Sequence, residues 1–283
     1  MRKIIGLCLA IILTAVMGSV PGQAGEAKSA KSGKSGKSGK VSSQKFMVKK
    51  RIPGDEDGSA RYLIFQGNKQ IASQLLNPNS EIMQQDGKIP DGVVREFDES
   101  GALTTQERYK GNKREGDYKE FYYGGAVHVW RHFKQGKEHG KTRIFTETGA
   151  LITEGPYVEG KLNGVEREYY ENGTLLSEKN FVDGLEQGVA VEYYEDGKVK
   201  SKSNRVNGKF EGIATEYNAE GKVIKETNFV DDKPHGLEKE YDDNGVLTAE
   251  TRYENGYRHG LRKTFDGNGA VIKEEMYENG QLK

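Results

Sequence analysis

The side chains in this sequence that could do chemistry are five histidines, many carboxylates and clusters of acidic turn residues. Three histidines occupy the same place in a periodic pattern, and two of them, His235 and His259, stand one period apart. If each period spans two strands, these imidazoles are ~9.6 Å apart, too far to share a metal ion bound at ~2.0–2.1 Å. His128 and His132 would lie ~13 Å apart along one strand. We therefore predict turn residues here and no metal site.

Acidic turns such as Glu171-Asn172-Gly173 contain the oxygen ligands that calcium prefers. The twelve-residue loop with alternating acidic ligands is absent, and Asn, Asp and Gly are the ordinary residues of tight turns. The remaining carboxylates recur from unit to unit, whereas a catalytic acid–base pair should be single and desolvated. The sequence also lacks a nucleophile elbow. These observations predict a non-enzymatic protein without a cofactor.

The element that positions all of these side chains is a 24-residue repeat. Glycines recur with this step in three phased series, represented in one unit by Gly160, Gly164 and Gly173. A period of 20–50 residues indicates a repeat architecture. Counting from Gly164 as zero, aromatic residues stand at +5 and usually at +17, and aliphatic residues stand at +11 and usually at +1. Even intervals within each half are typical of strands, so each unit is expected to form a β-hairpin.

Glycine placement predicts how the strands are linked. At Gly173 only the glycine is constant, which favours a three-residue loop, a type I turn with glycine in the left-handed bulge position. In that register Tyr169 faces Leu175, so positions +5 and +11 share one face of the sheet. The second link, from Gly184 to Gly188, is expected to be a five-residue loop.

Roughly eight hairpins pairing edge to edge would build a sheet ~75 Å long at ~4.8 Å per strand. Open sheets of that size curl. We therefore predict an all-β fold, one elongated, curled antiparallel sheet of tandem hairpins with its aromatic residues lining the inner face. Most aromatics are expected to hold the sheet together. Those that depart from the pattern form a candidate contact surface, because exposed aromatics favour interfaces: Tyr122, Tyr123, Trp130, Tyr170 and Tyr194.

Residues 1–24 have the form of a signal peptide. Arg2 and Lys3 precede the apolar run Ile4–Val16, and small residues follow at a potential cleavage site. An uncleaved membrane anchor is the alternative. The only cysteine, Cys8, lies inside the apolar run, so the mature chain would contain neither a disulfide nor a thiol nucleophile. An exported protein, periplasmic, bound to the cell envelope or secreted, is therefore expected.

Three further segments follow the signal peptide. Residues 25–45 form a Lys/Ser/Gly linker that lacks the apolar residues of a core, and it is expected to be disordered. Residues 46–86 are expected to be a degenerate N-terminal capping repeat with an insertion, and residues 87–283 to be the repeat array. Residues 1–51 carry 11 Lys and Arg against one acid, while the rest of the chain has a net charge of −10. The acidic body argues against nucleic-acid binding, and the basic segment is a tether or a contact for anionic lipid or wall polymer.

One pattern resembles a known repeat: Tyr-x-x-Gly-x-x-x-Gly-x-x-x-x-Tyr-(Tyr)-x-x-Gly-x-Leu, as from Tyr157 to Leu175 and from Tyr253 to Val271. It is similar to the MORN-variant repeat of bacterial proteins, which are often described as YwqK-like antitoxin components. The resemblance covers about residues 54–283. It implies hairpin repeats in an extended sheet, a binding or scaffolding role and no catalytic residue.

Together these features predict an exported, non-enzymatic repeat scaffold that mediates protein–protein interaction. A cell-envelope module that binds glycan or lipid is one alternative. An antitoxin-like neutralising protein is another, although an antitoxin that acts on a cytosolic toxin would not carry a signal peptide. The sequence predicts no nucleic-acid partner.

Overall fold

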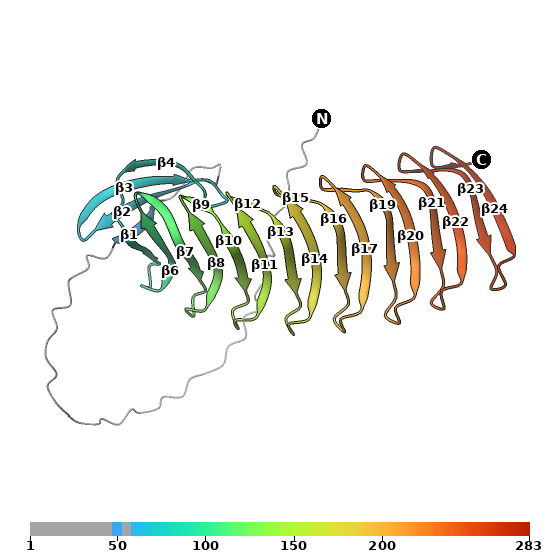
Figure 1. Ribbon diagram of the computed structural model, residues 1–283, viewed down its shortest axis with the longest axis horizontal. Helices are drawn as coiled ribbons and strands as arrows, with labels where there is room; N and C mark the ends of the chain where they lie inside the picture. The colour runs from blue at the N-terminus through green and yellow to red at the C-terminus, as the bar shows by residue number, and fades with distance from the viewer. Residues whose placement is uncertain (1–46, 53–57) are drawn as a thin grey trace, which may run out of the picture. The chain divides into compact units, whose positions relative to one another are not determined.

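The computed structural model describes residues 47–52 and 58–283, which belong to one compact unit, Gln44–Lys283. The predicted signal peptide and linker, residues 1–24 and 25–45, lie outside the described residues. The described part of the chain forms 25 strands in one open sheet (Figure 1), and it contains no helix long and apolar enough to cross a membrane. The predicted all-β fold of tandem hairpins is confirmed, with one parallel pairing in an otherwise antiparallel sheet.

Each repeat contributes one hairpin of two long strands. In the central repeat these are β13 (Gly164–Tyr169) and β14 (Leu175–Val182). The other long strands of the array are β5 (Gly92–Phe97), β6 (Leu103–Lys110), β7 (Lys113–Phe121), β8 (Val127–Lys134), β10 (Gly140–Phe145), β11 (Leu151–Val158), β16 (Gly188–Tyr193), β17 (Val199–Val206), β19 (Gly212–Tyr217), β20 (Val223–Val230), β21 (Lys233–Tyr241), β22 (Leu247–Glu254), β23 (Tyr257–Phe265) and β24 (Val271–Glu278). Two-residue strands follow some hairpins: β9 (Lys137–Glu138), β12 (Lys161–Leu162), β15 (Leu185–Glu186), β18 (Lys209–Phe210) and β25 (Gln281–Leu282).

The turn at Gly173 has the predicted form. The Gly173 amide donates to the Tyr170 carbonyl at 2.9 Å, and the Tyr170 amide donates to the Thr174 carbonyl at 2.8 Å, which closes a three-residue loop. Gly173 has a φ of 84°, a left-handed conformation that costs glycine little. Tyr169 lies directly opposite Leu175, so the predicted register is confirmed.

The second link differs from the predicted five-residue loop. Val182 pairs with Leu185, so Asp183 and Gly184 alone form the turn. Both have positive φ, 51° and 83°, the geometry of a type I′ turn that Asp-Gly and Asn-Gly tolerate. The loop predicted to extend to Gly188 is therefore wrong. Leu185 and Glu186 pair with β14 as the short strand β15. The register then shifts, and β16 also pairs with β14.

A register shift in each hairpin moves the aromatic residues onto two faces. In β13 and β14 the pairing shifts between Glu168 and Tyr169, so that Leu175 opposes Tyr169 but Ser177 opposes Glu168. Directly opposed residues share a face, so positions +5 and +11 lie on one face, while position +17, occupied here by Phe181, lies on the other. The prediction that all aromatics line one inner face is wrong because of this bulge.

We name the two faces by repeat position. The ladder face carries the side chains at +1, +3, +5, +11, +14, +16 and +18. The groove face carries those at +2, +4, +13, +15 and +17, and many of its side chains are buried although they are small or polar. Examples are Thr142, Ser177, Ala190, Thr227, Glu238, Ala249 and Thr251.

The N-terminal strands cover the groove face of the first repeats. The strand β1 (Met47–Ile52) pairs with β2 (Ala60–Gln66) and, in parallel, with β5, while β3 (Lys69–Leu76) pairs with both β2 and β4 (Ile82–Gly87). Ile64 of β2 belongs to the same buried apolar cluster as Val94 and Tyr109 of the first repeat. The Gln74 side chain of β3 also donates to the Tyr109 hydroxyl at 2.9 Å. We call β1–β4 the cap; the domain boundary placed between residues 86 and 87 stays a prediction.

A buried ion cluster centred on Glu107 lies beneath the cap. Its carboxylate is 3.1 Å from Lys49 Nζ and 2.7 Å from Arg114 Nε, and none of the three side chains is more than 4% exposed. Burial alone would raise the pKa of Glu107, but the two cations outweigh it and lower the pKa to about 2. Arg114 Nη1 also donates to the Ser80 carbonyl at 2.8 Å, so the cluster ties the loop between β3 and β4 to the first repeats.

Candidate functional site

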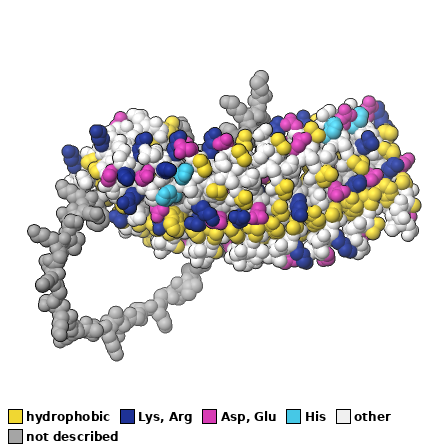
Figure 2. All heavy atoms as spheres, viewed as in Figure 1, with side chains coloured by type: hydrophobic (Ala, Val, Ile, Leu, Met, Phe, Trp, Pro, Cys, Tyr) yellow, Lys and Arg dark blue, Asp and Glu magenta, His cyan; other side chains and the backbone are white. Residues whose placement is uncertain are grey.

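Exposed aliphatic side chains form a row along the ladder face, beside the type I′ turns. They stand at +1 and +18 of successive repeats and are 38–61% exposed. We call this row the aliphatic stripe: Val158, Val165, Val182, Val189, Val206, Ile213, Val230 and Leu237. Figure 2 shows hydrophobic side chains recurring along the array on the face in view. Because large exposed apolar patches are favoured at binding surfaces, this row is a candidate interaction site.

Lysines stand next to the stripe at several type I′ turns. Lys209 pairs with Val206, and Lys233 pairs with Val230, so each lysine shares the ladder face with its partner valine. Lys209 also forms an ion pair with Asp231 of the next turn. The stripe is thus an apolar row bordered by charges that are partly neutralised by neighbours.

Three of the five predicted contact residues hold adjacent hairpins together. The hydroxyl groups of Tyr122, Tyr170 and Tyr194 each donate to a backbone carbonyl one repeat further on, at 2.9, 2.8 and 2.6 Å. The acceptors are the carbonyls of Phe145, Tyr193 and Tyr217, in that order. These bonds give the three tyrosines a structural role that the sequence pattern does not predict.

The other two predicted contact residues lie in different surroundings. Trp130 has Lys119 Nζ at 4.4 Å and the Arg143 guanidinium carbon at 5.6 Å from its ring centroid, a cation–π arrangement across the ladder face. Tyr123, in the turn after β7, is 80% exposed. The structure therefore does not gather the five residues into one cluster, and their role as a contact surface stays a prediction.

The hydrogen bond that the Tyr194 hydroxyl forms with the next repeat can be tested by removing that hydroxyl. Tyr194→Phe deletes the hydroxyl that donates to Tyr217 and leaves the carbonyl without this donor. We expect a loss of about 1 kcal/mol in the free energy of unfolding, measured by urea denaturation. Tyr123→Phe is the control, because an exposed hydroxyl should contribute almost nothing. Equal effects of the two changes would contradict the structural role of Tyr194.

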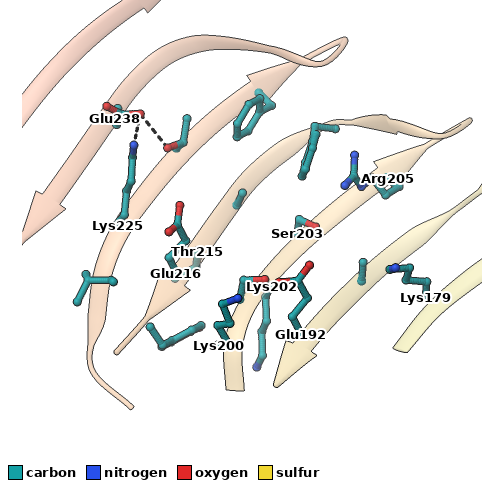
Figure 3. A pocket seen from close by; sticks show the side chains of 18 of the residues that line it. Lys179, Glu192, Lys200, Lys202, Ser203, Arg205, Thr215, Glu216, Lys225 and Glu238 are labelled. Atoms are coloured by element: carbon teal, nitrogen blue, oxygen red, sulfur yellow. Dashed lines mark hydrogen bonds and ion pairs between the residues drawn. The ribbon is translucent and has the colours of Figure 1, made fainter. Parts of the chain in front are cut away.

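A groove of about 510 Å³ opens on the groove face over β16–β21 (Figure 3). It exists because two consecutive repeats carry small residues where their neighbours carry large ones. At +2, Ala190 and Ala214 replace the glutamates found at Glu166 and Glu238. The floor is completed by small hydroxyl side chains at +13 and +15: Ser201, Ser203 and Thr227.

Arg205 lies at the side of this groove and interrupts a row of aromatics. Its guanidinium carbon is 3.2 Å from the Phe210 ring centroid, and Phe210 stacks on Phe229 at 4.9 Å. Arg205 Nε lies 3.5 Å from a carboxylate oxygen of Glu186, which is an ion pair but not an aligned hydrogen bond. In the other repeats position +17 is aromatic: Tyr109, Phe133, Tyr157, Phe181, Phe229, Tyr253 and Tyr277.

Sequence reasoning misses this groove although its signal is present in the sequence. The two alanines and the arginine break the repeat pattern within one stretch of the array. These substitutions point to a groove only if positions +2 and +17 are known to lie on the same face. That depends on the register shift within each hairpin, which the sequence pattern does not predict.

The His139 amide donates to the His132 carbonyl at 2.8 Å, and two of the histidine side chains have an acidic neighbour. His132 Nδ1 is 3.2 Å from Asp117, and His259 Nε2 is 3.6 Å from Glu254. Over residues 47–52 and 58–283, no group of three or more His, Cys, Asp or Glu side chains is placed to hold a metal ion.

Five consecutive stretches of the chain match the family model of the MORN repeat variant. They are residues 162–183, 186–207, 210–231, 234–255 and 258–279. Each stretch contains one hairpin of the array together with the short segment that leads into it. No curated protein sequence matches the chain.

Two solved structures are similar to parts of the chain at low identity. One is an S. aureus TarM mutant in complex with Fondaparinux, alpha-GlcNAc-glycerol and UDP, with 15% identity, a TM-score of 0.20 and coverage of 39% of this chain and 19% of that chain. The other is TcdB2-TccC3-Cdc42, with 10% identity, a TM-score of 0.19 and coverage of 79% and 15%. The match spans less than a fifth of the length of either structure, and neither supports a functional argument.

Proposed function

The chain carries tandem MORN repeat variants, and from this premise we propose that it is an exported, non-enzymatic scaffold that binds another protein through the aliphatic stripe. A repeat array of this kind serves binding or scaffolding. The observation that carries the proposal is the stripe itself, eight aliphatic side chains that are each at least 38% exposed. It extends over about 34 Å, at ~9.6 Å per repeat, so it suits a partner with an elongated apolar surface.

A lipid surface is the second candidate, because lysines border the stripe. Two observations favour a protein. Lys209 is already paired with Asp231, and the chain after residue 51 carries a net charge of −10, which opposes approach to an anionic bilayer. A protein interface tolerates such paired charges at its rim.

The proposed binding can be tested with the double variant Val189→Glu/Ile213→Glu. Both side chains are 61% exposed, so the change should leave the fold intact while placing two charges in the stripe. With the full tagged chain as bait in envelope extract, we expect the captured partner to fall at least tenfold, as measured by quantitative mass spectrometry. The two introduced carboxylates would lose water on binding without gaining a charged partner, and this weakens an interface.

The control is Val271→Glu, a 45% exposed valine outside the stripe, which should capture as much partner as the unchanged chain. Co-sedimentation with anionic phospholipid vesicles forms a second arm. Vesicle binding lost in the double variant, without any protein captured, would replace the protein partner by a lipid surface.

Export is supported by the sequence alone, from Arg2 and Lys3 followed by the apolar run Ile4–Val16. When the full chain is produced in bacteria, we expect the envelope fraction to contain a form that begins at Gly25. N-terminal sequencing of that fraction is the measurement. A chain that stays in the cytosol with residues 1–24 attached would contradict export and leave the binding proposal standing.

A further inference from the structure

We propose that the groove over β16–β21 is a second binding site, separate from the aliphatic stripe. We infer that it takes an extended polypeptide segment of a partner protein, with an acidic side chain that binds Arg205. The inference goes beyond the scaffold proposal because it concerns the opposite face of the sheet and names the chemistry of the occupant.

The groove leaves room for the main chain of a peptide because the side chains that form its floor are short. Ala190 and Ala214 end at Cβ where the neighbouring repeats have glutamates. The Ser203 hydroxyl lies in the lining and can hydrogen-bond to a peptide group, whereas the Thr227 hydroxyl already donates to Glu238 at 3.0 Å. An extended peptide exposes backbone amides and carbonyls that can hydrogen-bond to polar groups of such a floor, as in other proteins that bind extended peptides.

Five cations line the groove, Lys179, Lys200, Lys202, Arg205 and Lys225, and Arg205 is the one held against an aromatic ring. At the two ends of the groove, Lys179 is held by Glu168 at 3.3 Å and Lys225 by Glu238 at 3.2 Å. Within the described residues, Arg205 has only the 3.5 Å ion pair with Glu186, and stacking on Phe210 holds its guanidinium plane in place. A fixed guanidinium fork matches a carboxylate with two parallel hydrogen bonds.

The cap shows what an arginine–aromatic pair on this face does when it is covered. Tyr109 and Arg114 oppose each other in adjacent strands, as Arg205 and Phe210 do, with the order of the two residues exchanged. Arg114 Nη1 donates to the backbone carbonyl of Ser80, which belongs to the overlying cap. The chain therefore contains its own example of a segment seated on the groove face and anchored by an arginine.

The lining carries charges of both signs, which limits how densely charged the occupant can be. Four glutamates, Glu186, Glu192, Glu216 and Glu238, stand there among five Lys and Arg side chains, so a densely charged occupant of either sign would meet like charges. The basic linker of this chain, residues 25–45, would place lysines against Arg205. A segment with one or two acidic residues among uncharged ones fits best.

Peptide display tests the site although the partner is unidentified. A library of random twelve-residue peptides is selected on the full chain, and the affinities of the selected peptides are measured by fluorescence anisotropy. We expect a consensus with at least one Asp or Glu. Affinity should fall at least tenfold in Arg205→Tyr and in Ala214→Glu, each of which introduces a residue that other repeats already carry at that position.

The control is Val191→Lys, which changes the neighbouring ladder face to the residue found at Lys239 and Lys263, and binding should be unchanged. Unfolding midpoints of all variants are recorded, so that a folding defect is recognised. The proposal is overturned if no peptide is selected, if the consensus lacks acidic residues, or if Arg205→Tyr and Ala214→Glu bind as well as the unchanged chain. Peptides lost only in Val189→Glu/Ile213→Glu would also overturn it, while supporting the stripe.

Discussion

Replacing Glu107 by glutamine is expected to lower the free energy of unfolding by about 3–5 kcal/mol at neutral pH. The substitution keeps the size of the side chain but removes its charge, so Lys49 and Arg114 are left buried with their main counter-ion gone. Lys49 would retain only Glu96, at 3.4 Å, among the residues that the structure describes. Urea denaturation of the full chain, followed by circular dichroism, measures the loss.

The matched control for this change is Glu178→Gln. Glu178 accepts from Arg167 Nε at 2.7 Å, the same distance as in the buried pair, but the two side chains are 31% and 40% exposed. Solvent screens such a pair, so its loss should cost less than about 1 kcal/mol. If both glutamine variants lost the same stability, burial would not be the source of the effect.

The same cluster predicts a dependence of stability on pH. The folded-state pKa of Glu107, about 2, lies below the value of an unfolded glutamate. The carboxylate therefore contributes stability in full above about pH 4.5, and this contribution is lost as the pH falls towards 2. The difference in stability between the unchanged chain and Glu107→Gln should shrink across that window. A difference that stayed constant from about pH 4.5 down to about pH 2 would contradict the assignment.

Gly87→Ala should be the most damaging single methyl group that can be added to the cap. Gly87 has a φ of +83°, and a Cβ built there would lie 2.3 Å from the carbonyl oxygen of Ile71 and 3.0 Å from Ala72 Cα. Backbone atoms cannot move aside as a flexible side chain can, so β4 must separate from β3. We expect a loss of about 2–4 kcal/mol, with faster hydrogen exchange in β3 and β4.

Gly101→Ala separates the clash from the backbone conformation. Gly101 has nearly the same φ, +86°, but its Cβ would have no atom within 4 Å. This variant should therefore show only the cost of a left-handed alanine, about 1–2 kcal/mol. A Gly87 variant no less stable than the Gly101 variant would show that the cap does not close as tightly as the structure has it.

The hairpins can be predicted from the sequence because glycine spacing and strand periodicity are local properties. The three-residue loop at Gly173 and the pairing of Tyr169 with Leu175 follow from them and are confirmed. The prediction for the second link is wrong because it treats two glycines, Gly184 and Gly188, as the ends of one loop. The residue before Gly184, an aspartate that tolerates positive φ, is the signal for a two-residue turn.

The bulge and the cap are beyond what local patterns specify. A bulge inserts one extra residue in a strand, so the side chains before and after it point to opposite faces. The 24-residue spacing is unchanged by it, and the aromatics at +5 and +17 therefore look equivalent in the sequence. The parallel pairing of β1 with β5 and the cluster of Lys49, Glu107 and Arg114 join segments that are distant in the chain. Such contacts depend on how the N-terminal strands fold over the first repeats, and no single repeat contains the information.

The strict period of the aliphatic stripe has a consequence for recognition. A partner that contacted only the stripe would meet the same surface again after every step of ~9.6 Å and could slide among several equivalent positions. The two repeats with Ala190 and Ala214 are the place where this uniformity ends. A ligand that also binds the groove would be fixed at one position along the array. The irregular repeats would therefore determine where along the repetitive surface a partner binds.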